Sequence, residues 1–210
     1  MIAVTPAQAA AARGVTEVLH FTTEKGVLGA LAAGRLLSRA KVQEDPSVAF
    51  IFTGVWPRRD PDWLDFVSLS LTRINRELYA KAAHNLPELW WAILSFQPEI
   101  LDHRGVFFTT TNNVYEDVCE RGEGAAGFEA MFEQRVPWGY YGSVKHRSHG
   151  RADNLPTDVQ AEVLYPQSID LSYLYCIYVP EEQHRSLVLA WCDVLGRSEP
   201  TVVVRRDLFS

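Results

Sequence analysis

Alternation of apolar and polar residues is the clearest structural signal in this chain. In residues 66–71, Ser68 and Ser70 fall on one face, and Val67, Leu69 and Leu71 fall on the other. This pattern predicts a strand with one buried face. Apolar runs rich in β-forming residues predict further strands at 18–22, 90–96, 106–109, 173–179 and 201–205.

Residues 159–164 and the tyrosine-rich run that follows also read as strand. Because successive side chains of a strand point to opposite faces, Gln160 and Glu162 are expected on one face, with Ala161 and Val163 on the other. One ionisable carboxylate would then stand on a strand face beside an amide. An exposed strand face that happens to carry these two residues is the ordinary alternative.

Apolar residues spaced three and four apart predict the helices. In residues 23–33, Val27, Leu28 and Leu31 share one face, Thr22 or Thr23 can cap the first turn, and Gly34 ends the helix. Further helices are expected at 6–13, 75–83, 127–133 and 181–195. Short strands outnumber helices, and several are expected to be antiparallel, which indicates an α+β or mainly β core with helices packed at its sides.

Two long stretches, 39–65 and 136–158, lack a regular pattern. Connections of that length in a compact domain usually serve a function or are mobile. The second stretch runs directly into Glu162.

Composition narrows the class of protein. A chain of 210 residues that is 47% hydrophobic fits one folded domain spanning residues 1–210. No apolar run reaches the length of a membrane span, and the N-terminus lacks the basic segment of a signal peptide. Cys119, Cys176 and Cys192 are odd in number and widely spaced, so we expect small core residues and a cytoplasmic protein.

Three strand faces carry groups that could do chemistry. These pairs are His20 with Thr22, Ser68 with Ser70, and Gln160 with Glu162. Each pair has an ordinary structural interpretation as a satisfied histidine, a helix cap or a solvated strand face. No dinucleotide fingerprint, P-loop or zinc-protease motif is present, and His146 and His149 have no third ligand at a metal spacing. The sequence therefore predicts no metal site.

The segment 138–151 combines aromatic and basic residues. The aromatic residues are Trp138, Tyr140 and Tyr141, and the basic ones are Lys145, Arg147 and Arg151. In a chain of net charge -6, nucleic acid would have to bind through a local cationic patch of this kind. Rings beside cations suit single-stranded nucleic acid, because bases stack on the rings and phosphates meet the cations. A solvated loop whose aromatic residues dock on the core is an equal alternative.

Three segments in this order resemble the DarT family of toxins, which ADP-ribosylate bases in single-stranded DNA. The first is Leu19-His-Phe-Thr22 with the following helix and Gly34-Arg-Leu-Leu-Ser38. The second is Phe66-Val-Ser-Leu-Ser70, preceded by Arg59 and Asp60. The third is Gln160-Ala-Glu-Val-Leu164, and the resemblance extends from about Val18 to Phe209.

The resemblance implies an ADP-ribosyltransferase fold, with two small packed sheets around an NAD cleft and helices at their flanks. It implies transfer of ADP-ribose from NAD to a DNA base with release of nicotinamide, and no metal. By this analogy the catalytic residues are Glu162 and Arg59, with Arg58 as the adjacent alternative. NAD would be bound by His20, Phe21, Thr22, Ser68 and Gln160, and DNA by the aromatic and basic residues of 138–151.

The chemistry agrees with this analogy. Breaking the bond between nicotinamide and ribose develops positive charge on the sugar, which a fixed carboxylate stabilises. The resemblance also implies single-stranded DNA and an ADP-ribose-removing antitoxin, of the macrodomain type or another, as partners. The 67–70 pattern favours guanine over thymine as the modified base. The alternatives are a nucleic-acid-binding domain without catalysis and a transferase of the same fold that modifies RNA or protein.

Overall fold

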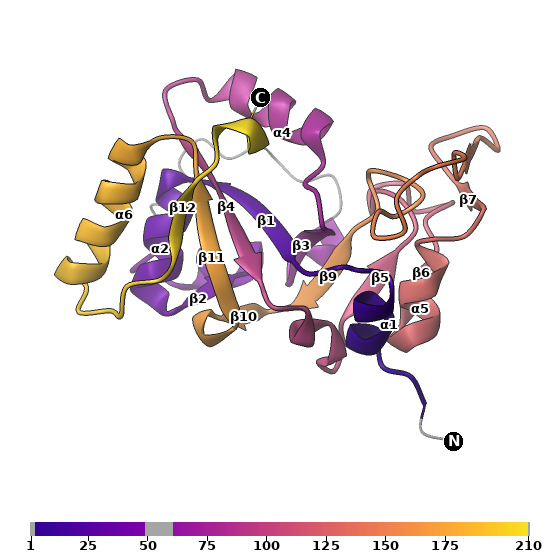
Figure 1. The fold of residues 1–210 in the computed structure, drawn as a ribbon, viewed down its shortest axis with the longest axis horizontal. Helices are drawn as coiled ribbons and strands as arrows, with labels where there is room; N and C mark the ends of the chain where they lie inside the picture. Colours follow the sequence, from indigo (N-terminus) through magenta and orange to yellow (C-terminus); the bar gives the residue numbers. More distant parts are fainter. Residues whose placement is uncertain (1–2, 49–60, 210) are drawn as a thin grey trace.

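Eight strands are hydrogen-bonded into the main sheet of this computed structural model, which describes residues 3–48 and 61–209 (Figure 1). Their spatial order is β12-β11-β4-β1-β3-β9-β5-β6, and every neighbouring pair is antiparallel except β11 and β12. The strands are β1 (Val18–Thr23), β3 (Phe66–Leu71), β4 (Trp91–Phe96), β5 (Phe107–Thr109), β6 (Arg121–Glu123), β9 (Val163–Pro166), β11 (Leu174–Val179) and β12 (Val202–Val204).

Two short ribbons stand beside the main sheet. Strand β2 (Arg35–Leu37) pairs with β10 (Ser168–Asp170), and β7 (Arg135–Pro137) pairs with β8 (Val144–His146). The sequence analysis missed β6, β7, β8 and β10 and left β2 unassigned. Each spans three residues, which is too short for alternation to be recognised.

The main sheet opens between β1 and β3. These strands pair only through Val18 with Leu71 and Leu19 with Ser70, whereas β1 pairs with β4 along its whole length. Beyond Leu19, β1 continues with β4 and β3 continues with β9. The α+β prediction is confirmed. The two expected sheets are two four-stranded halves of one sheet, because this short pairing still connects them.

Helices cover both faces of the sheet (Figure 1). They are α1 (Pro6–Ala12), α2 (Glu24–Ala33), α3 (Arg39–Glu44), α4 (Arg76–Asn85), α5 (Gly124–Ala130) and α6 (Glu182–Val194), with 3₁₀ turns at Pro61–Trp63, Pro98–Asp102, Leu171–Tyr173 and Arg206–Leu208. The sequence analysis expected no helix in 39–65, yet Ser38 caps α3 by accepting the N–H of Lys41. Helix α5 begins three residues before its predicted start. Within the described ranges, none of these helices has the length and apolar character that crossing a membrane requires.

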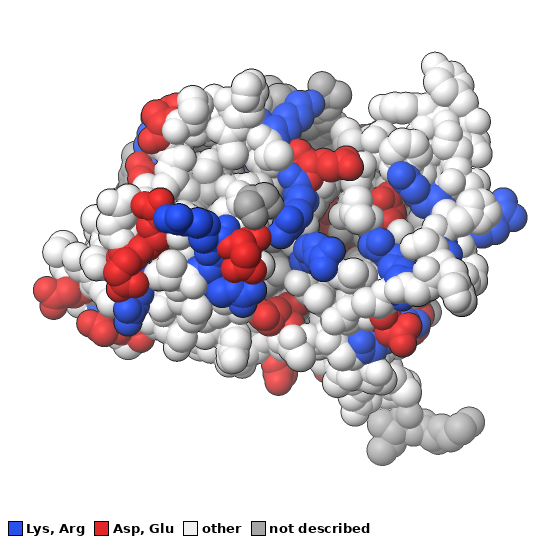
Figure 2. Space-filling model, turned by 45° about the horizontal axis from the view of Figure 1, so that its top comes forward, with Lys and Arg blue, Asp and Glu red and all other residues white. Residues whose placement is uncertain are grey.

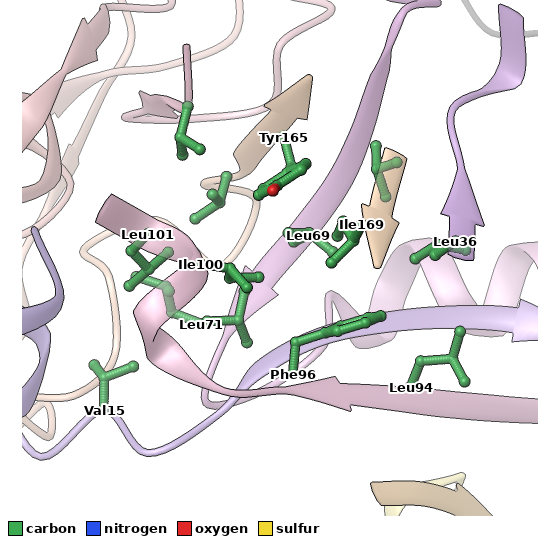
Figure 3. Packing of buried hydrophobic residues seen from close by; sticks show 14 of the residues in the cluster. Val15, Leu36, Leu69, Leu71, Leu94, Phe96, Ile100, Leu101, Tyr165 and Ile169 are labelled. Carbon is green, nitrogen blue, oxygen red and sulfur yellow. The ribbon is translucent and has the colours of Figure 1, made fainter. Parts of the chain in front are cut away.

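Two hydrophobic clusters lie on opposite faces of the half formed by β12, β11, β4 and β1, and the larger one extends onto β3 and β9. The larger one joins β3, β4, β9 and β10 to helices α2 and α6, and Figure 3 shows Phe96 and Leu94 within it. The smaller one includes Leu19, Ile93 and Tyr178, with Tyr79 of α4 and Phe209 packed against it. All six residues of β4 are buried, because this strand is covered on both faces. The three cysteines are also buried and unpaired, which agrees with their predicted place in the core.

Candidate active site

A cleft of ≈ 820 Å³ opens where β1 and β3 separate. Its wall includes residues of β1, α2, α4, β3 and the segment before β9. All three polar strand faces identified in the sequence meet here, because their six residues line the same cleft: His20, Thr22, Ser68, Ser70, Gln160 and Glu162.

The segment of Glu162 differs from its prediction in one respect. Strand β9 begins only at Val163, because the backbone turns at Asp158. The Asp158 carboxylate accepts the N–H of Gln160 at 3.2 Å, and the Asp158 carbonyl oxygen accepts the N–H of Ala161. The predicted alternation is nevertheless present: Ala161 and Val163 are buried, while Gln160 and Glu162 face the cleft.

Both oxygens of the Glu162 carboxylate have a hydrogen-bond donor. The hydroxyl of Ser68 donates to Oε1, and the backbone N–H of Asn113 donates to Oε2 at 2.9 Å. The Glu162 backbone is held as well, since its N–H donates to the hydroxyl oxygen of Thr109 and its carbonyl accepts the Thr109 N–H, each at 2.9 Å. These contacts orient an acceptor group at the wall of the cleft.

His20 connects the two halves of the sheet where their backbones stop pairing. Its Nδ1 lies 2.9 Å from the carbonyl oxygen of Ser68. Because a carbonyl only accepts, Nδ1 carries the hydrogen in this contact. Ser68 therefore contacts both His20, through its carbonyl, and Glu162, through its hydroxyl.

Thr22 and Gly26 are in close contact at the start of α2. A Cβ atom added to Gly26 would lie 1.9 Å from Oγ1 of Thr22, so only glycine fits beside this threonine. The N-cap position of α2 is Thr23, and its side chain makes no capping hydrogen bond. Phe21 borders the cleft, but its ring packs against Tyr79 and Trp91, with centroids 5.8 and 5.9 Å away.

The sequence analysis assigned no role to three cations that line the cleft: Arg35, Arg39 and Lys81. Among the described residues around the cleft, Glu162 is the one carboxylate. Two of the cations lie in or next to the motif Gly34–Ser38, which was noted only as part of a resemblance. The sequence analysis also assigned no role to residues 110–113, which reach the site through Asn112 and Asn113.

The predicted DNA-binding loop is the β7–β8 hairpin and the segment after it. Tyr140 and Tyr141 are exposed at the hairpin tip, and Tyr141 has a left-handed backbone with φ 60°. Trp138 is half-buried, with Nζ of Lys145 4.2 Å from its ring centre and Tyr115 packed at its edge. The hairpin therefore presents two accessible rings and one ring covered by a cation.

Arg147 and Arg151 make backbone contacts within the loop. Arg147 donates to the carbonyl oxygens of Leu155 at 2.8 Å and Ala152 at 2.9 Å, and Arg151 donates to that of Pro156. Burial lowers the pKa of the Arg151 guanidinium, and the charges of Arg147 and Arg73 lower it further. Two of the three basic residues that were predicted to bind DNA, Arg147 and Arg151, therefore also stabilise the backbone of this loop.

A second cavity of ≈ 190 Å³ adjoins the cleft. It shares Ser70, Asn75 and Ala161 with the cleft, and Arg73 and Arg151 also line it. Figure 2 shows Lys and Arg side chains following one another across this face towards the hairpin, although the whole chain has net charge -6. The sequence analysis did not identify Arg73.

Arg59, its neighbour Arg58 and Asp60 lie outside the described residues. Within residues 3–48 and 61–209, no group of three or more His, Cys, Asp or Glu residues could hold a metal ion.

Comparison with known proteins places the chain in a family. Residues 19–210 match the family model described as "ssDNA thymidine ADP-ribosyltransferase, DarT". No curated protein matches the chain.

Solved structures show the same fold. The DarT of Thermus sp. 2.9 in complex with carba-NAD+ is 15% identical, with a TM-score of 0.62 over 93% of this chain and 98% of that one. The same protein in complex with ADP-ribosylated ssDNA is 14% identical, with a TM-score of 0.62 over 94% and 97%. Thermosipho africanus DarTG in complex with ADP-ribose is 14% identical, with a TM-score of 0.55 over 92% of this chain and 51% of that one.

The family match covers nearly the whole chain and includes the cleft with its oriented carboxylate. The chain therefore belongs to the DarT family and is an NAD-dependent DNA ADP-ribosyltransferase.

Proposed function

We propose that Glu162 is the catalytic carboxylate and that the cleft holds NAD with its ribose facing this residue. The observation that carries the proposal is the double hydrogen bonding of Glu162 by Ser68 and Asn113 in the cleft wall. When the bond between ribose C1 and the nicotinamide nitrogen breaks, the electron pair leaves with nicotinamide and positive charge develops on the sugar. The Glu162 carboxylate stabilises that charge, because it is already oriented before the reaction.

The second half of the reaction forms a bond between a base nitrogen and ribose C1. That nitrogen must lose a proton, and the Glu162 carboxylate is the general base that we assign to accept it. By analogy with the family, Arg59 is proposed as the second catalytic residue.

NAD binding in the cleft uses its cations and its polar strand faces. Arg35 and Arg39 suit the diphosphate, because a guanidinium matches phosphate oxygens with two parallel donors. His20, Thr22, Ser68 and Gln160 line the same cleft and position the rest of the molecule. Phe21 contributes indirectly, because its ring packs against Tyr79 and Trp91 and so stabilises the strand that carries His20 and Thr22. The Thermus sp. 2.9 DarT complexes with NAD+ and carba-NAD+ support NAD as the molecule that the cleft binds.

Single-stranded DNA is proposed to cross the β7–β8 hairpin and the second cavity before a base enters the cleft. Tyr140 and Tyr141 offer rings for stacking, and Trp138 with Lys145 adds a ring and a cation. Arg73, Arg76 and Arg151 line the cavity beside the cleft together with Glu77 and Asp158, so three cations face two carboxylates and the remaining positive charge favours an anion such as a phosphate. The Thermus sp. 2.9 DarT complex with ADP-ribosylated ssDNA supports single-stranded DNA as the substrate.

Two expectations differ about which base is modified. The 67–70 pattern favours guanine, whereas the family description names thymidine. The biological role is that of a toxin paired with an antitoxin that removes ADP-ribose, by analogy with the family. Thermosipho africanus DarTG, whose chain is about twice as long as the matched region, was solved with ADP-ribose and is consistent with such a pairing.

Incubation with labelled NAD tests the function directly. Parallel reactions contain single-stranded oligonucleotides that lack one base each, an RNA of the same sequence, and a protein lysate. We expect label only on DNA, and mass spectrometry of the digested oligonucleotide identifies the base as guanine or thymine. Label on RNA or protein would show that DNA is not the substrate. Binding of the DNA strand without any label would show a nucleic-acid-binding domain without catalysis.

A further inference from the structure

The connection between β5 and β6 carries the backbone N–H that reaches the Glu162 carboxylate. Asn113 belongs to this connection, residues 110–120, and its N–H donates to Oε2 of Glu162 at 2.9 Å. The Asn113 side chain is completely buried. The placement of this donor on the carboxylate therefore depends on how the connection is held.

Arg121, the first residue of β6, binds both ends of the connection. Its Nε donates to Oδ1 of Asn113 at 2.6 Å, and Nη2 donates to the Asn113 carbonyl oxygen at 2.9 Å. Nη1 donates to the carbonyl oxygen of Cys119 at 3.1 Å, and the guanidinium carbon lies 5.3 Å from the ring centre of Trp63. Three bonds in fixed directions suit a planar guanidinium, and a lysine ammonium cannot reproduce all of them.

Other contacts close the connection without touching Asn113. The N–H of Thr110 donates to the Glu120 carbonyl oxygen at 3.1 Å, and the hydroxyl of Thr111 donates to the Asp158 carboxylate at 2.6 Å. Tyr115, on the outer side, packs edge-on against Tyr140 of the hairpin with centroids 5.4 Å apart. The connection can therefore stay folded when Arg121 is changed, while Asn113 loses its two hydrogen bonds from Arg121.

We propose that Arg121 is a positioning residue for ADP-ribose transfer, which holds the Asn113 N–H on the Glu162 carboxylate. This inference rests on the proposed catalytic role of Glu162. A carboxylate that loses a donor is oriented less well and is protonated more readily. Loss of the hydrogen bonds from Arg121 lowers kcat and moves the acidic limb of the pH–rate profile to higher pH, while binding of NAD and of the strand changes little.

The test compares four variants of the full chain with the parent. Arg121→Met removes all three hydrogen bonds of the guanidinium, and Arg121→Lys keeps the positive charge without the planar guanidinium. Asn113→Ala keeps the backbone N–H of residue 113 and two of the three hydrogen bonds from Arg121. Arg197→Met is the matched control, because its guanidinium also donates to a backbone carbonyl, that of Ala32 at 2.9 Å, at the far end of α2.

We expect kcat of Arg121→Met to fall about 10–100-fold, with KM for NAD changed less than about twofold. Arg121→Lys and Asn113→Ala should lose less, in step with the bonds that each retains, and Arg197→Met should keep the parent kcat. A parent-like kcat and acidic limb in Arg121→Met would overturn the inference. If Arg121→Met does not fold, the same comparison in Arg121→Lys and Asn113→Ala decides.

Glu162→Gln separates this inference from the proposed function. If Glu162→Gln transfers ADP-ribose at the parent rate, the catalytic assignment of Glu162 fails and the positioning role fails with it. If Glu162→Gln is inactive while all Arg121 variants keep the parent kcat and pH profile, only the role of Arg121 is wrong.

Discussion

The Nδ1 atom of His20 lies 2.9 Å from the carbonyl oxygen of Ser68, across the point where β1 and β3 stop pairing. A side chain thus replaces the next backbone hydrogen bond between the two halves of the sheet. The halves stay connected while their backbones diverge, and the cleft occupies the resulting space. The same Ser68 donates its hydroxyl to Glu162, so one residue links the opening of the sheet to the carboxylate.

Glu162→Gln should abolish most of the transfer activity. The substitution keeps the size of the side chain and its acceptor oxygen but removes the charge that stabilises the developing cation on ribose. We expect kcat to fall by about 10²–10⁴-fold with little change in NAD affinity. Single-turnover assays and calorimetric titration with NAD measure the two quantities separately. Near-parental turnover would exclude Glu162 from the mechanism.

Gly26→Ala should destabilise the cleft through a direct clash. Helix propensity favours alanine by about 1 kcal/mol, but the new Cβ would lie 1.9 Å from Oγ1 of Thr22. Relieving that overlap should cost about 1–3 kcal/mol of the free energy of unfolding and weaken NAD binding. In the double variant Thr22→Ala/Gly26→Ala the obstructing hydroxyl is gone, so the thermal melt should recover most of the loss. A single variant as stable as the parent would contradict the close contact.

Arg73→Gln combined with Lys145→Gln should weaken binding of single-stranded DNA and reduce its salt dependence. Each lost phosphate contact lowers the slope of log affinity against log salt by about 0.7 for a single strand. Fluorescence anisotropy of a labelled oligonucleotide over a salt series measures the slope. Arg185→Gln is the control, because Arg185 pairs with Glu182 on the exposed side of α6. Equal slopes in all three proteins would exclude these cations from the DNA path.

Tyr141→Gly should separate DNA binding from stability. Tyr141 is fully exposed and has a left-handed backbone, so glycine relieves about 1 kcal/mol of strain and costs a similar amount in chain entropy. The free energy of unfolding should therefore stay within about 1 kcal/mol of the parent. Loss of a stacking ring should reduce strand affinity by about 1–3 kcal/mol without changing the salt slope. Unchanged strand affinity would show that the ring contacts no base.

The three cysteines should react slowly with alkylating reagents in the folded protein. Burial raises the pKa of the Cys119, Cys176 and Cys192 thiols, so little of the reactive thiolate is present between pH 7 and about 8. Mass spectrometry after iodoacetamide treatment should find labelling only after unfolding in urea. Rapid labelling of one cysteine in the native protein would show that its segment opens.

The sequence by itself determined the main elements and the composition of the site. Local periodicity depends on residues a few positions apart, so it located seven of the eight main-sheet strands and the five longer helices. It identified the strand face of Ser68 and Ser70. It also indicated Glu162 and His20, because a polar residue that interrupts a strand pattern is visible in the chain. The resemblance to DarT rested on these same short segments, and the family match confirmed it.

Tertiary structure alone decided which donors hold the carboxylate and which cations face the cleft. The Asn113 contact joins residues 49 positions apart, and the Ser68 contact joins residues 94 positions apart. The sequence predicts Arg147 and Arg151 as DNA contacts, and only the fold shows that their guanidinium groups also donate to carbonyl oxygens of their own loop while Arg151 borders the second cavity. An arginine meets a carbonyl or a phosphate with the same donors, so only the folded backbone determines which of them it finds.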